Sequence, residues 1–575
     1  MMHKTSQLEP SRAISGQGAY HVPRAAAPVD LRLDGNEGAQ PPAVLFTVLS
    51  SIGASVIRNY PSACELENLL AERHGVDPSQ VLVTAGADDA LDRMCRAMLE
   101  EGRSMILPEP SFEMLRRYGL LAGGAVVSVP WPDGAFPRAA VLEAVDDSTA
   151  MIVMVTPNNP TGGVATAADL AAVASGAPHA LIVLDHAYVE FADEDLTEAA
   201  KTYPNVVVAR TLSKAWGLAG LRVGYAIGPA RVIEWLRATG HPYAVSGPSL
   251  AMAKWRVETG AEDMAAFVDA VADERRRLEV LLNELGADAQ PSQGNFVFAR
   301  HPNSLWIRDG LASLGIAIRA FPGREGLEDG LRIACPGNED DFARLEHGLR
   351  TVLAPEAILF DVDGVLADVS ESYRRCIIET AASFGVEIGL EDVTAVKAAG
   401  QANNDWVVTR RILASRGVEV SLDEVTSRFE ELYQGTDDAP GLRSREGLIC
   451  TIGWLEKLAG TRSLGLVTGR PRKDAERFLR DEGIEGFFDA LVCMEDGPLK
   501  PDPAPVLRAM ELMDVERVWF IGDTPDDARA GRAAGAVSLG IIAPGEAEGS
   551  IGKSLIETGA GRILAHLDEL EELLK

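Results

Sequence analysis

Two groups of residues with different chemistry follow one another along the 575-residue chain. The first group contains Lys214 and Arg222 in the segment TLSKAWGLAGLRVGY. The second group begins with Asp361 and Asp363 in the segment ILFDVDGVLAD. A lysine amine can react with a carbonyl compound, whereas a carboxylate can attack a phosphoryl group. The sequence therefore predicts two separate reaction centres on one polypeptide.

The residues around Lys214 fit a site for pyridoxal phosphate (PLP). Thr211, Ser213 and Arg222 lie close to the lysine in the sequence and could together bind a cofactor phosphate. A PLP ring needs an acid near its pyridine nitrogen so that it can act as an electron sink. Asp185 ends the apolar run ALIVLD and could supply that acid.

Residues in other turns could bind the ring oxygen and the phosphate of the cofactor. Tyr188 follows the strand-end acid and Asn159 lies in the turn TPNNPTGG, and both could hydrogen-bond the oxygen of the ring. Gly86, Ala87 and Asp88 stand between an apolar run and a helix-like stretch, so their backbone amides could hold a phosphate. Each of these segments taken alone is also compatible with an ordinary turn or strand end.

The two aspartates of the second group fit phosphoryl transfer. Residues i and i+2 of a continuing strand share a face, so Asp361 could act as nucleophile and Asp363 as general acid on one phosphoryl group. More polar residues follow at the ends of later segments: Thr468 in LGLVTGR, Lys500 in LKPDP, and Asp523 and Asp527 in VWFIGDTPDDARAG. Carboxylates without histidine or cysteine suit Mg²⁺. A lysine and a hydroxyl would balance charge on the phosphoryl oxygens.

Short apolar runs must position these residues. The runs alternate with longer helix-like stretches, which is typical of parallel α/β sheets. They cover residues 81–86, 150–156, 180–185, 205–211 and 357–363. Ligands of open α/β sheets bind beyond the carboxyl ends of the strands, where the polar residues that end these runs would lie.

The boundary between the two halves is expected in TVLAPEAILF, where a helical pattern stops at Ala354-Pro355 and a buried strand begins. We expect an N-terminal arm over residues 1–28, a first half over 29–354 and a second half over 355–575. The expected subdivisions are a large domain at about 50–245, a small domain at about 29–45 and 246–354, a core at 355–368 and 446–575, and a helical insert at 369–445.

Composition restricts the partners. A net charge of −31 argues against nucleic acid. The six cysteines have no CxxC spacing and the nine histidines form no zinc-type cluster, so we expect reduced thiols and no zinc. Because no apolar run approaches about 18 residues and no signal peptide is recognisable, we expect a cytoplasmic protein without a membrane segment. Small-molecule substrates are the remaining expectation.

The motifs of the first half together resemble fold-type-I PLP enzymes of the histidinol-phosphate aminotransferase family, over about residues 25–350. The motifs are LDGNEG (Asn36), NYPSA (Tyr60), TAGADDALD, PEPSF (Phe112), TPNNPTG, DHAYVEF, the lysine segment, SQGNFVFAR (Asn295) and LRIACPG (Arg332). The chain departs from the family at Phe112, where tyrosine is frequent, and at His186, where DEAY is expected. We expect His186 to point away from the ring, with little effect on the chemistry.

This resemblance implies roles for the first half. Lys214 would bind PLP covalently and move the proton during transamination. The other implied roles are ring binding by Asp185, Tyr188 and Asn159, ring stacking by Phe112, phosphate binding by Ala87, Asp88, Ser213 and Arg222, and substrate binding by Asn36 and Arg332. Tyr60 would reach the cofactor phosphate of a partner subunit, which implies a homodimer.

The second half resembles the haloacid-dehalogenase (HAD) phosphatase superfamily over about residues 356–575. Asp361 would be the nucleophile, and Asp363 would protonate the leaving group and then activate water. Thr468 and Lys500 would bind the phosphoryl group. The implied magnesium ligands are Asp361, Asp363, Asp523 and Asp527.

The insert at 369–445 resembles the small helical cap of the first subgroup of this superfamily. In KAAGQANNDW, Lys397, Asn403 or Asn404 could select the leaving group, although this segment is also compatible with an ordinary helix–loop–helix surface. The implied fold is a PLP-dependent transferase fold type I, with a large α/β/α domain and a small α+β domain. A HAD-like Rossmannoid α/β domain with a helical cap would follow it.

We therefore expect a bifunctional enzyme. The first half would convert imidazole-acetol phosphate and L-glutamate to L-histidinol phosphate and 2-oxoglutarate, and the second half could hydrolyse L-histidinol phosphate. The alternatives for the first half are an aromatic or other amino-acid aminotransferase and a threonine-phosphate decarboxylase. The second half could instead be a regulatory or docking module, or could hydrolyse another small phosphate in a repair role.

Overall fold

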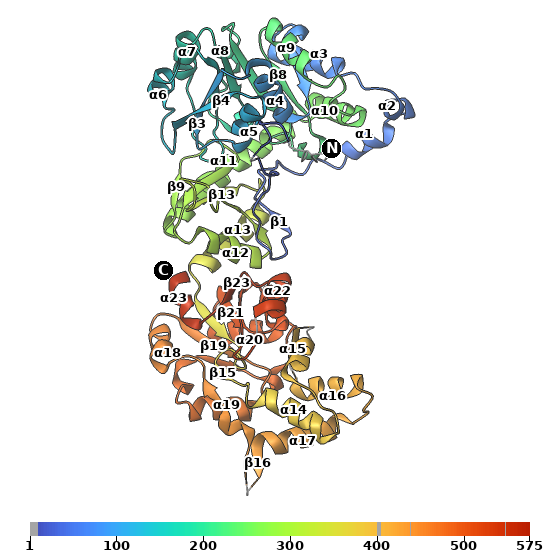
Figure 1. Cartoon of the computed structure of the whole chain (residues 1–575), viewed down its shortest axis with the longest axis vertical. Coiled ribbons are helices and arrows are strands. Elements are labelled where there is room, and N and C mark those ends of the chain that lie inside the picture. The colour runs from blue at the N-terminus through green and yellow to red at the C-terminus, as the bar shows by residue number, and fades with distance from the viewer. Residues whose placement is uncertain (1–9, 16, 399–403, 437–438, 547, 575) are drawn as a thin grey trace, which may run out of the picture. The chain divides into compact units, whose positions relative to one another are not determined.

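The computed structural model describes residues 10–15, 17–398, 404–436, 439–546 and 548–574 of the chain (Figure 1). The chain forms two compact units. The first unit contains residues 1–23, 33–302 and 319–342, and the second contains residues 24–32, 303–318 and 343–575. Both units are mixed α/β structures, as the sequence predicts.

A seven-stranded sheet lies at the centre of the first unit, in the order β2-β8-β7-β6-β5-β3-β4. Its strands are β2 (Val81–Thr84), β3 (Ser104–Glu109), β4 (Ala125–Pro130), β5 (Thr149–Val155), β6 (Leu181–Asp185), β7 (Val206–Thr211) and β8 (Gly224–Ile227). Strand β8 runs antiparallel to β2 and β7, and the pairs among β3 to β7 are parallel. The carboxyl ends of β5, β6 and β7 therefore lie at one edge.

Both faces of this sheet are covered, which explains why its strands are apolar throughout rather than alternating. In β5, Ile152 and Met154 belong to one apolar layer, and Met151 and Val153 belong to the other. The helices of the first layer are α3 (Cys64–His74), α7 (Ala167–Gly176) and α10 (Gly247–Thr259). The helices of the second layer are α4 (Gly86–Met98), α5 (Glu113–Leu121) and α9 (Ala230–Thr239).

A smaller antiparallel sheet, in the order β12-β13-β10-β9, completes the first unit. Its strands are β9 (Asp288–Gln290), β10 (Phe296–Arg300), β12 (Arg319–Ala320) and β13 (Gly330–Ala334). The long helix α11 (Ala261–Glu284) packs on β9 and β10. The register of β12 and β13 places Arg319 directly opposite Arg332.

The second unit is built on a six-stranded parallel sheet in the order β20-β19-β14-β21-β22-β23. Its strands are β14 (Ala357–Phe360), β19 (Ser463–Val467), β20 (Ala490–Val492), β21 (Val518–Gly522), β22 (Val537–Ile541) and β23 (Arg562–Leu564). The helices between these strands are α18 (Ile452–Ala459), α19 (Arg472–Asp481), α20 (Ala504–Met513), α21 (Pro525–Ala533) and α22 (Glu548–Thr558).

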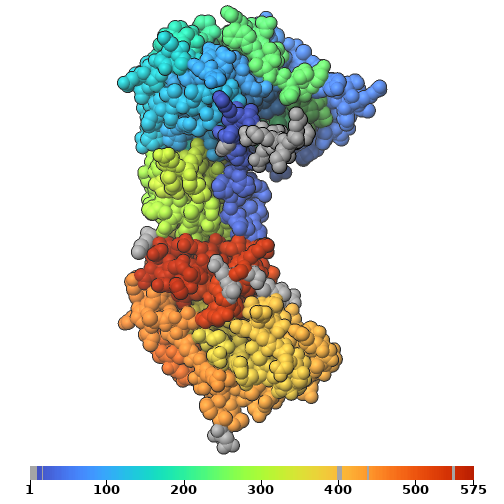
Figure 2. Space-filling view, in the orientation of Figure 1, coloured from blue at the N-terminus to red at the C-terminus, as the bar shows by residue number. Residues whose placement is uncertain are grey.

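A helical insert follows β14 and returns to the core through the antiparallel pair β15 (Ala367–Asp368) and β18 (Gly447–Leu448). Its helices are α14 (Tyr373–Ser383), α15 (Leu390–Ala398), α16 (Asp405–Ser415) and α17 (Leu422–Gln434). The insert has a small apolar core of its own, which includes Leu413 and Val425. In Figure 2 its first helices form a rounded yellow lobe beside the red residues of the core of this unit.

The second unit also contains elements from earlier in the chain. Strand β1 (Leu31–Arg32) pairs with β11 (Ile316–Ala317), and helix α12 (Ser304–Ser313) packs on β22. The ring of Trp306 in α12 meets that of Trp519 in β21 edge to face, with 5.0 Å between the ring centres. The sequence predicts that these early segments belong to the first half of the chain, and that division stays a prediction.

Candidate active sites

Lys214 lies three residues after β7, in a loop beside the carboxyl ends of the parallel strands. Its Nζ donates a hydrogen bond to the backbone oxygen of Gly35 (2.9 Å) and lies 5.6 Å from the centre of the Tyr188 ring. The fold thus brings together the lysine and a ring-binding residue that follows another strand.

Asp185 is the last residue of β6 and is 3% exposed. Burial raises the pKa of Asp185 to about 7. Among the described residues, the hydrogen bond from the amide of Ala187 lowers this pKa, and the charge of Asp88 raises it. A buried carboxylate without a cationic neighbour is costly. The protonated nitrogen of a PLP ring would be that neighbour, so this acid fits the cofactor.

The hydroxyl of Tyr188 accepts hydrogen bonds from two amide side chains, Nδ2 of Asn36 (3.1 Å) and Nδ2 of Asn159 (3.4 Å). Asn36 has a φ of 53°, and its backbone oxygen accepts a hydrogen bond from Asn295 (3.2 Å). Within the described residues, the buried Oδ1 of Asn36 has no hydrogen-bond partner. This oxygen is therefore free to accept a hydrogen bond from a ligand.

The first turn of α4 lies close to Arg222 and to strand β8. A Cβ on Gly86 would lie 2.8 Å from Nη2 of Arg222, and a Cβ on Gly224 would lie 2.5 Å from the amide nitrogen of Ala87. Both positions therefore need glycine, which lets Arg222 and strand β8 approach the amides at the start of α4, and such helix amides favour an anion. Arg222 also donates to Oδ2 of Asp88 (2.9 Å), so these predicted phosphate-binding residues lie together.

The remaining predicted cofactor residues of this subunit lie on neighbouring elements. Thr211 ends β7 opposite Gly224 and donates a hydrogen bond to Oγ of Ser213 (3.0 Å). Phe112 immediately precedes α5 and is half-buried. These positions are compatible with a common site around Lys214.

His186 makes its contacts elsewhere. It is 1% exposed, and its Nδ1 lies 3.5 Å from Oγ1 of Thr197 and 3.6 Å from Oδ1 of Asp195. Burial and the charge of Arg210 lower the pKa of His186, against the opposite effect of Asp195. None of these contacts involves a residue assigned to the cofactor, so the histidine adds no group to that site.

Arg332 and Arg319 form an unusual pair on adjacent strands. Arg332 donates to Oδ1 of Asn159 (2.7 Å) and to the backbone oxygen of Asp34 (2.6 Å). Arg319 is 6% exposed, and its Nη2 lies 3.5 Å from Oε1 of Glu113. Its Nη1 is buried and lacks a hydrogen-bond partner in the described part of the chain. Like charges placed directly opposite repel each other, so this pair favours an anionic ligand.

Sequence reasoning missed Arg319 and also Tyr20 of the N-terminal arm. Burial and Glu113 raise the pKa of the Tyr20 phenol to about 12, whereas Arg319 and Arg332 lower it, so the phenol lies within electrostatic reach of both arginines. An arginine inside the apolar segment IAIRAF is the signal that could have identified Arg319. The sequence offers no comparable signal for Tyr20.

Three aspartates of the second unit form a group. The carboxylates of Asp361, Asp523 and Asp527 are buried and offer ligand atoms within 4.8 Å of one another. Nζ of Lys500 lies 3.0 Å from Asp361 and 2.6 Å from Asp527, and Arg374 lies 3.3 Å from Asp523. Burial raises the pKa of Asp361 and of Asp523, despite these cations. Three oxygen ligands with this charge fit Mg²⁺.

Asp363 has a different environment. Strand β14 ends at Phe360 and Gly364 has a φ of 76°, so Asp361 and Asp363 do not lie on a continuing strand as the sequence argument assumed. The Oδ1 of Asp363 accepts a hydrogen bond from Nε of Arg470 (2.5 Å). Its carboxylate is not part of the group of three, and a role of Asp363 at the metal stays a prediction.

The predicted phosphoryl-binding residues also lie at the carboxyl edge of the parallel sheet. Thr468 directly follows β19 and is 4% exposed, and its Oγ1 accepts a hydrogen bond from the amide of Arg470 (3.2 Å). Lys500 donates to the backbone oxygen of Val467, the last residue of the same strand (3.1 Å). The hydroxyl and the amine thus lie beside the end of one strand.

Two of the three residues of the insert that were predicted to select the leaving group make contacts within the insert. Lys397 is 8% exposed and lies 3.3 Å from Oδ1 of Asp405. The side chain of Asn404 caps α16 by accepting from the amide of Val407 (3.0 Å). Asn403 lies outside the described residues.

The two sites define two classes of enzyme. A lysine, a buried acid and a helix-bound phosphate cradle at one sheet edge are the parts of a PLP-dependent transferase. Buried aspartates with a lysine at the edge of a parallel sheet, beside a helical insert, are the parts of a HAD-like hydrolase.

The family models agree with this assignment. The model of aminotransferase class I and II matches residues 34–347, more than half of the chain, and the chain belongs to this family. The model of haloacid dehalogenase-like hydrolase matches residues 355–535. The expectation of two enzyme domains in series, the first of them PLP-dependent, is confirmed.

Curated relatives cover different parts of the chain. An aromatic amino acid aminotransferase from Mycobacteroides abscessus is 35% identical over 338 residues, 57% of this chain and 96% of the relative. A histidinol-phosphate aminotransferase from Thermoanaerobacter sp. is 30% identical over 348 residues, 59% of this chain and 97% of the relative. An imidazoleglycerol-phosphate dehydratase from Phytophthora nicotianae is 42% identical over 236 residues, 38% of this chain. The chain spans only 52% of that dehydratase.

A solved structure supports the fold. The histidinol-phosphate aminotransferase from Sinorhizobium meliloti, in complex with pyridoxal-5'-phosphate, aligns with a TM-score of 0.55 and 24% identity. The alignment covers 60% of this chain and 99% of that chain. The helices and strands of the first half are therefore arranged as in that solved structure. Separately, no helix in the described ranges has the length and apolarity needed to cross a membrane.

Proposed function

We propose that the first half transfers an amino group between L-glutamate and imidazole-acetol phosphate, and that the second half hydrolyses the resulting L-histidinol phosphate to L-histidinol. The pairing of Arg319 with Arg332 carries this proposal. A phosphate dianion can accept hydrogen bonds from both guanidinium groups, which suit phosphate and carboxylate oxygens. An aromatic side chain would leave the buried Nη1 of Arg319 without a partner.

The relatives support an aminotransferase reaction, and they are compatible with two classes of substrate. Histidinol-phosphate aminotransferases and aromatic amino acid aminotransferases both align over more than half of the chain. The second candidate, an aromatic amino-acid aminotransferase, has the higher identity, 35% against 30%. We favour the phosphorylated substrate because charge at the site, rather than overall identity, decides which substrate is bound.

The residues of the first half would act as follows. Asp185 would hold the ring nitrogen of PLP in its protonated form, and Tyr188 and Asn159 would hold the ring oxygen. Lys214 would take the proton from the amine-bearing carbon of the donor and, in the second half of the reaction, would deliver a proton to the corresponding carbon of the acceptor. Arg332, fixed by Asn159, would bind the carboxylate of glutamate and share the phosphate of the second substrate with Arg319. Bound PLP would stabilise the negative charge that develops between these proton transfers.

The residues of the second half would transfer a phosphoryl group. Asp361 would attack phosphorus, while Thr468 and Lys500 would hold the phosphoryl oxygens. Asp363 would give a proton to the leaving alcohol. Mg²⁺, held by Asp361, Asp523 and Asp527, would offset the negative charge of the phosphoryl group and the carboxylates.

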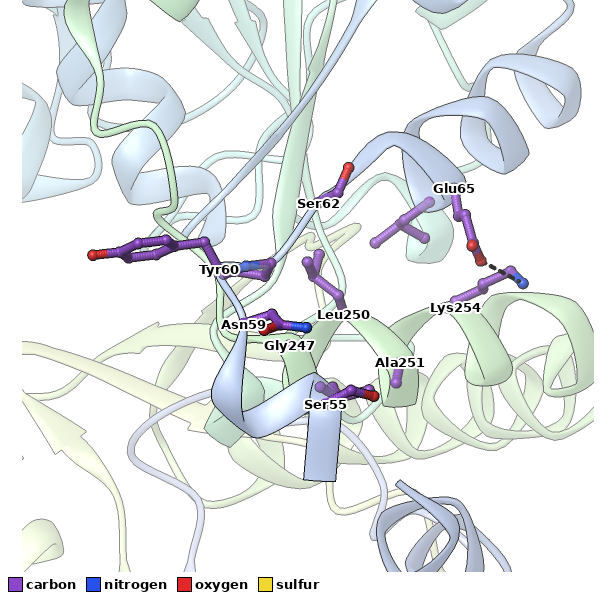
Figure 3. A pocket seen from close by; sticks show the side chains of 12 residues that line it. Ser55, Asn59, Tyr60, Ser62, Glu65, Gly247, Leu250, Ala251 and Lys254 are labelled. Carbon is purple, nitrogen blue, oxygen red and sulfur yellow. Dashed lines mark ion pairs between the residues drawn. The ribbon is translucent and has the colours of Figure 1, made fainter. Parts of the chain in front are cut away.

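The working assembly is proposed to be a cytoplasmic homodimer. Tyr60 is 81% exposed and stacks on Tyr243, with 4.5 Å between the ring centres. Figure 3 shows its ring pointing away from Ser55 and Lys254, and all three residues line a cavity of about 340 Å³. An exposed tyrosine of this kind is available to a second subunit, where it would reach the cofactor phosphate.

The proposal is tested by comparing substrates for each half. With PLP and glutamate or its oxo acid, turnover should be fastest for the histidinol phosphate couple and slower for phenylalanine, and threonine phosphate should not be decarboxylated. In the presence of Mg²⁺, phosphate should be released from histidinol phosphate, and Asp361→Asn should abolish the release. Preference for phenylalanine would favour the aromatic alternative, and release unchanged in Asp361→Asn would favour a regulatory or docking module.

A further inference from the structure

Arg470 is a buried arginine of the second unit that holds two carboxylates at once. Its Nε and Nη2 both lie 2.5 Å from Oδ1 of Asp363, and its Nη1 donates to Oε2 of Glu446 (2.9 Å). The guanidinium carbon lies 5.0 Å from the centre of the Tyr373 ring and 5.1 Å from that of Phe478. The side chain is 0% exposed.

Glu446 connects Arg470 to both ends of the helical insert. It precedes β18, the strand by which the chain returns to the core. Its Oε1 accepts hydrogen bonds from Oγ of Ser372, the residue before α14, and from the hydroxyl of Tyr433 in α17 (2.9 Å and 3.0 Å). One carboxylate thus contacts the residue before α14, a residue of α17 and the arginine of the core.

These contacts fix the orientation of the guanidinium. Arginine is a planar fork whose donors point in set directions, and two rings close to its guanidinium restrict rotation. Desolvation alone would lower the pKa of Arg470, but Asp363 and Glu446 together raise it well above its usual value. Because the arginine occupies Oδ1 of Asp363, the other oxygen, Oδ2, is the one we expect to exchange a proton.

We propose that Arg470 is a positioning residue for phosphoryl transfer: it orients the carboxylate of Asp363 toward the leaving oxygen, and Glu446 ties that orientation to the helical insert. This inference rests on the proposed phosphatase function. In the first step, an oxygen of Asp361 forms a bond to phosphorus and the bond from phosphorus to the substrate oxygen breaks. The electron pair stays on that oxygen, which takes the proton of Asp363.

The second step restores the enzyme. Asp363, now a carboxylate, takes a proton from water as the water oxygen forms a bond to phosphorus. The bond between Asp361 and phosphorus breaks, its electron pair returns to the Asp361 carboxylate, and inorganic phosphate leaves. Both steps need Oδ2 of Asp363 to face the reacting oxygen, so misorientation of this carboxylate should slow them.

Two substrates with different leaving groups can distinguish a loss of Asp363 positioning from a general loss of folded protein. An alkyl phosphate leaves as a basic alkoxide and needs the proton of Asp363, whereas p-nitrophenolate leaves without one. The full-length protein with Mg²⁺ would be assayed on 2-phenylethyl phosphate and on p-nitrophenyl phosphate. The variants are Arg470→Lys, Glu446→Gln and, as a matched control, Arg517→Lys, since Arg517 forms an ion pair with Glu356 (2.6 Å) in the same unit.

Arg470→Lys should lower kcat/KM, which reports the first step, about 10- to 100-fold for the alkyl phosphate and under about 3-fold for p-nitrophenyl phosphate, because only the alkyl leaving group needs the proton of Asp363 in that step. Glu446→Gln keeps an acceptor for Ser372 and Tyr433 and should show a smaller loss with the same leaving-group dependence. Arg517→Lys should change neither rate. Equal losses on both substrates in Arg470→Lys and Glu446→Gln would overturn the positioning role alone. A wild-type protein that releases phosphate from neither compound and not from L-histidinol phosphate would refute the phosphatase function and the role of Arg470 with it.

Discussion

Arg319 and Arg332 lie directly opposite each other on the antiparallel strands β12 and β13, and both side chains are at least nine-tenths buried. Arg332 is held by Asn159 and the backbone of Asp34, whereas Arg319 keeps one donor without a partner among the described residues. Such a pair is electrostatically unfavourable until an anion binds between the two groups. The substrate proposal for the first half follows from this relationship.

Replacement of Arg319 should affect the phosphorylated substrate more than glutamate. A hydrogen bond to a charged group contributes about 1.5–3 kcal/mol, so Arg319→Gln should raise the KM for L-histidinol phosphate about 10- to 100-fold. Steady-state kinetics with both substrates would measure this. Arg300→Gln is a matched control, because Arg300 lies in the same sheet and pairs with Asp329 (2.5 Å). An equal rise for glutamate would argue against a phosphate subsite.

The buried Asp185 should make the stability of the cofactor-free protein depend on pH. Its pKa is about 7 in the folded protein, against about 3.9 in an unfolded chain. The folded state binds this proton more tightly, so stability is highest at low pH and falls as the pH rises toward about 7. Asp185→Asn should flatten the fall in melting temperature between about pH 4 and about pH 7, whereas the exposed control Asp147→Asn should not. Parallel curves for wild type and Asp185→Asn would contradict this expectation.

Magnesium should stabilise the protein through the three aspartates. A ligand at 100 times its Kd adds about 2.7 kcal/mol to the free energy of unfolding, so the melting temperature should rise with Mg²⁺. Asp527→Asn should remove most of this rise. Asp526→Asn is the control, because the adjacent Asp526 is buried but forms an ion pair with Arg529 (3.0 Å). If Asp526→Asn and Asp527→Asn reduced the rise equally, the assignment of the ligands would be wrong.

The shared-site homodimer can be tested by mixing inactive variants. Tyr60→Ala and Lys214→Ala should each lose most aminotransferase activity as separate proteins. In a hybrid dimer, one site would receive both intact residues, so mixing after mild dissociation should restore part of the activity. If mixing restored nothing although hybrid dimers formed, Tyr60 would act in its own subunit or not at all.

Most of the strand ends could be predicted from the sequence because their residues are apolar throughout and end in a polar residue. The segments that end in Asp185 and Thr211 both became strands, and their ends lie beside Lys214 as expected. The three aspartates of the second unit also came together from separate segments. In each case an apolar run that ends in a polar residue predicts the strand, and ligands of parallel sheets bind at the carboxyl ends of the strands, where these polar residues lie.

The other features of the two sites depend on how distant strands pair and on where strands end in turns. Arg319 joins Arg332 only through the pairing of β12 with β13, which the short segment IAIRAF does not specify. The argument that Asp361 and Asp363 share a face of one strand was wrong, because β14 ends at Phe360 rather than continuing. Arg470 was overlooked because its partner Glu446 lies 24 residues away, at the far end of the insert. Side-chain pairs of this kind are decided by tertiary packing rather than by local sequence.

The most direct test of the account is to follow one reaction mixture through both sites. The full-length protein with PLP would be given L-glutamate and imidazole-acetol phosphate, and the products would be identified by NMR with and without Mg²⁺. We predict 2-oxoglutarate and L-histidinol phosphate without the metal, and L-histidinol with an equal amount of inorganic phosphate when it is present. Formation of 2-oxoglutarate with L-histidinol phosphate left intact in Mg²⁺ would contradict the central claim that one chain carries out both reactions.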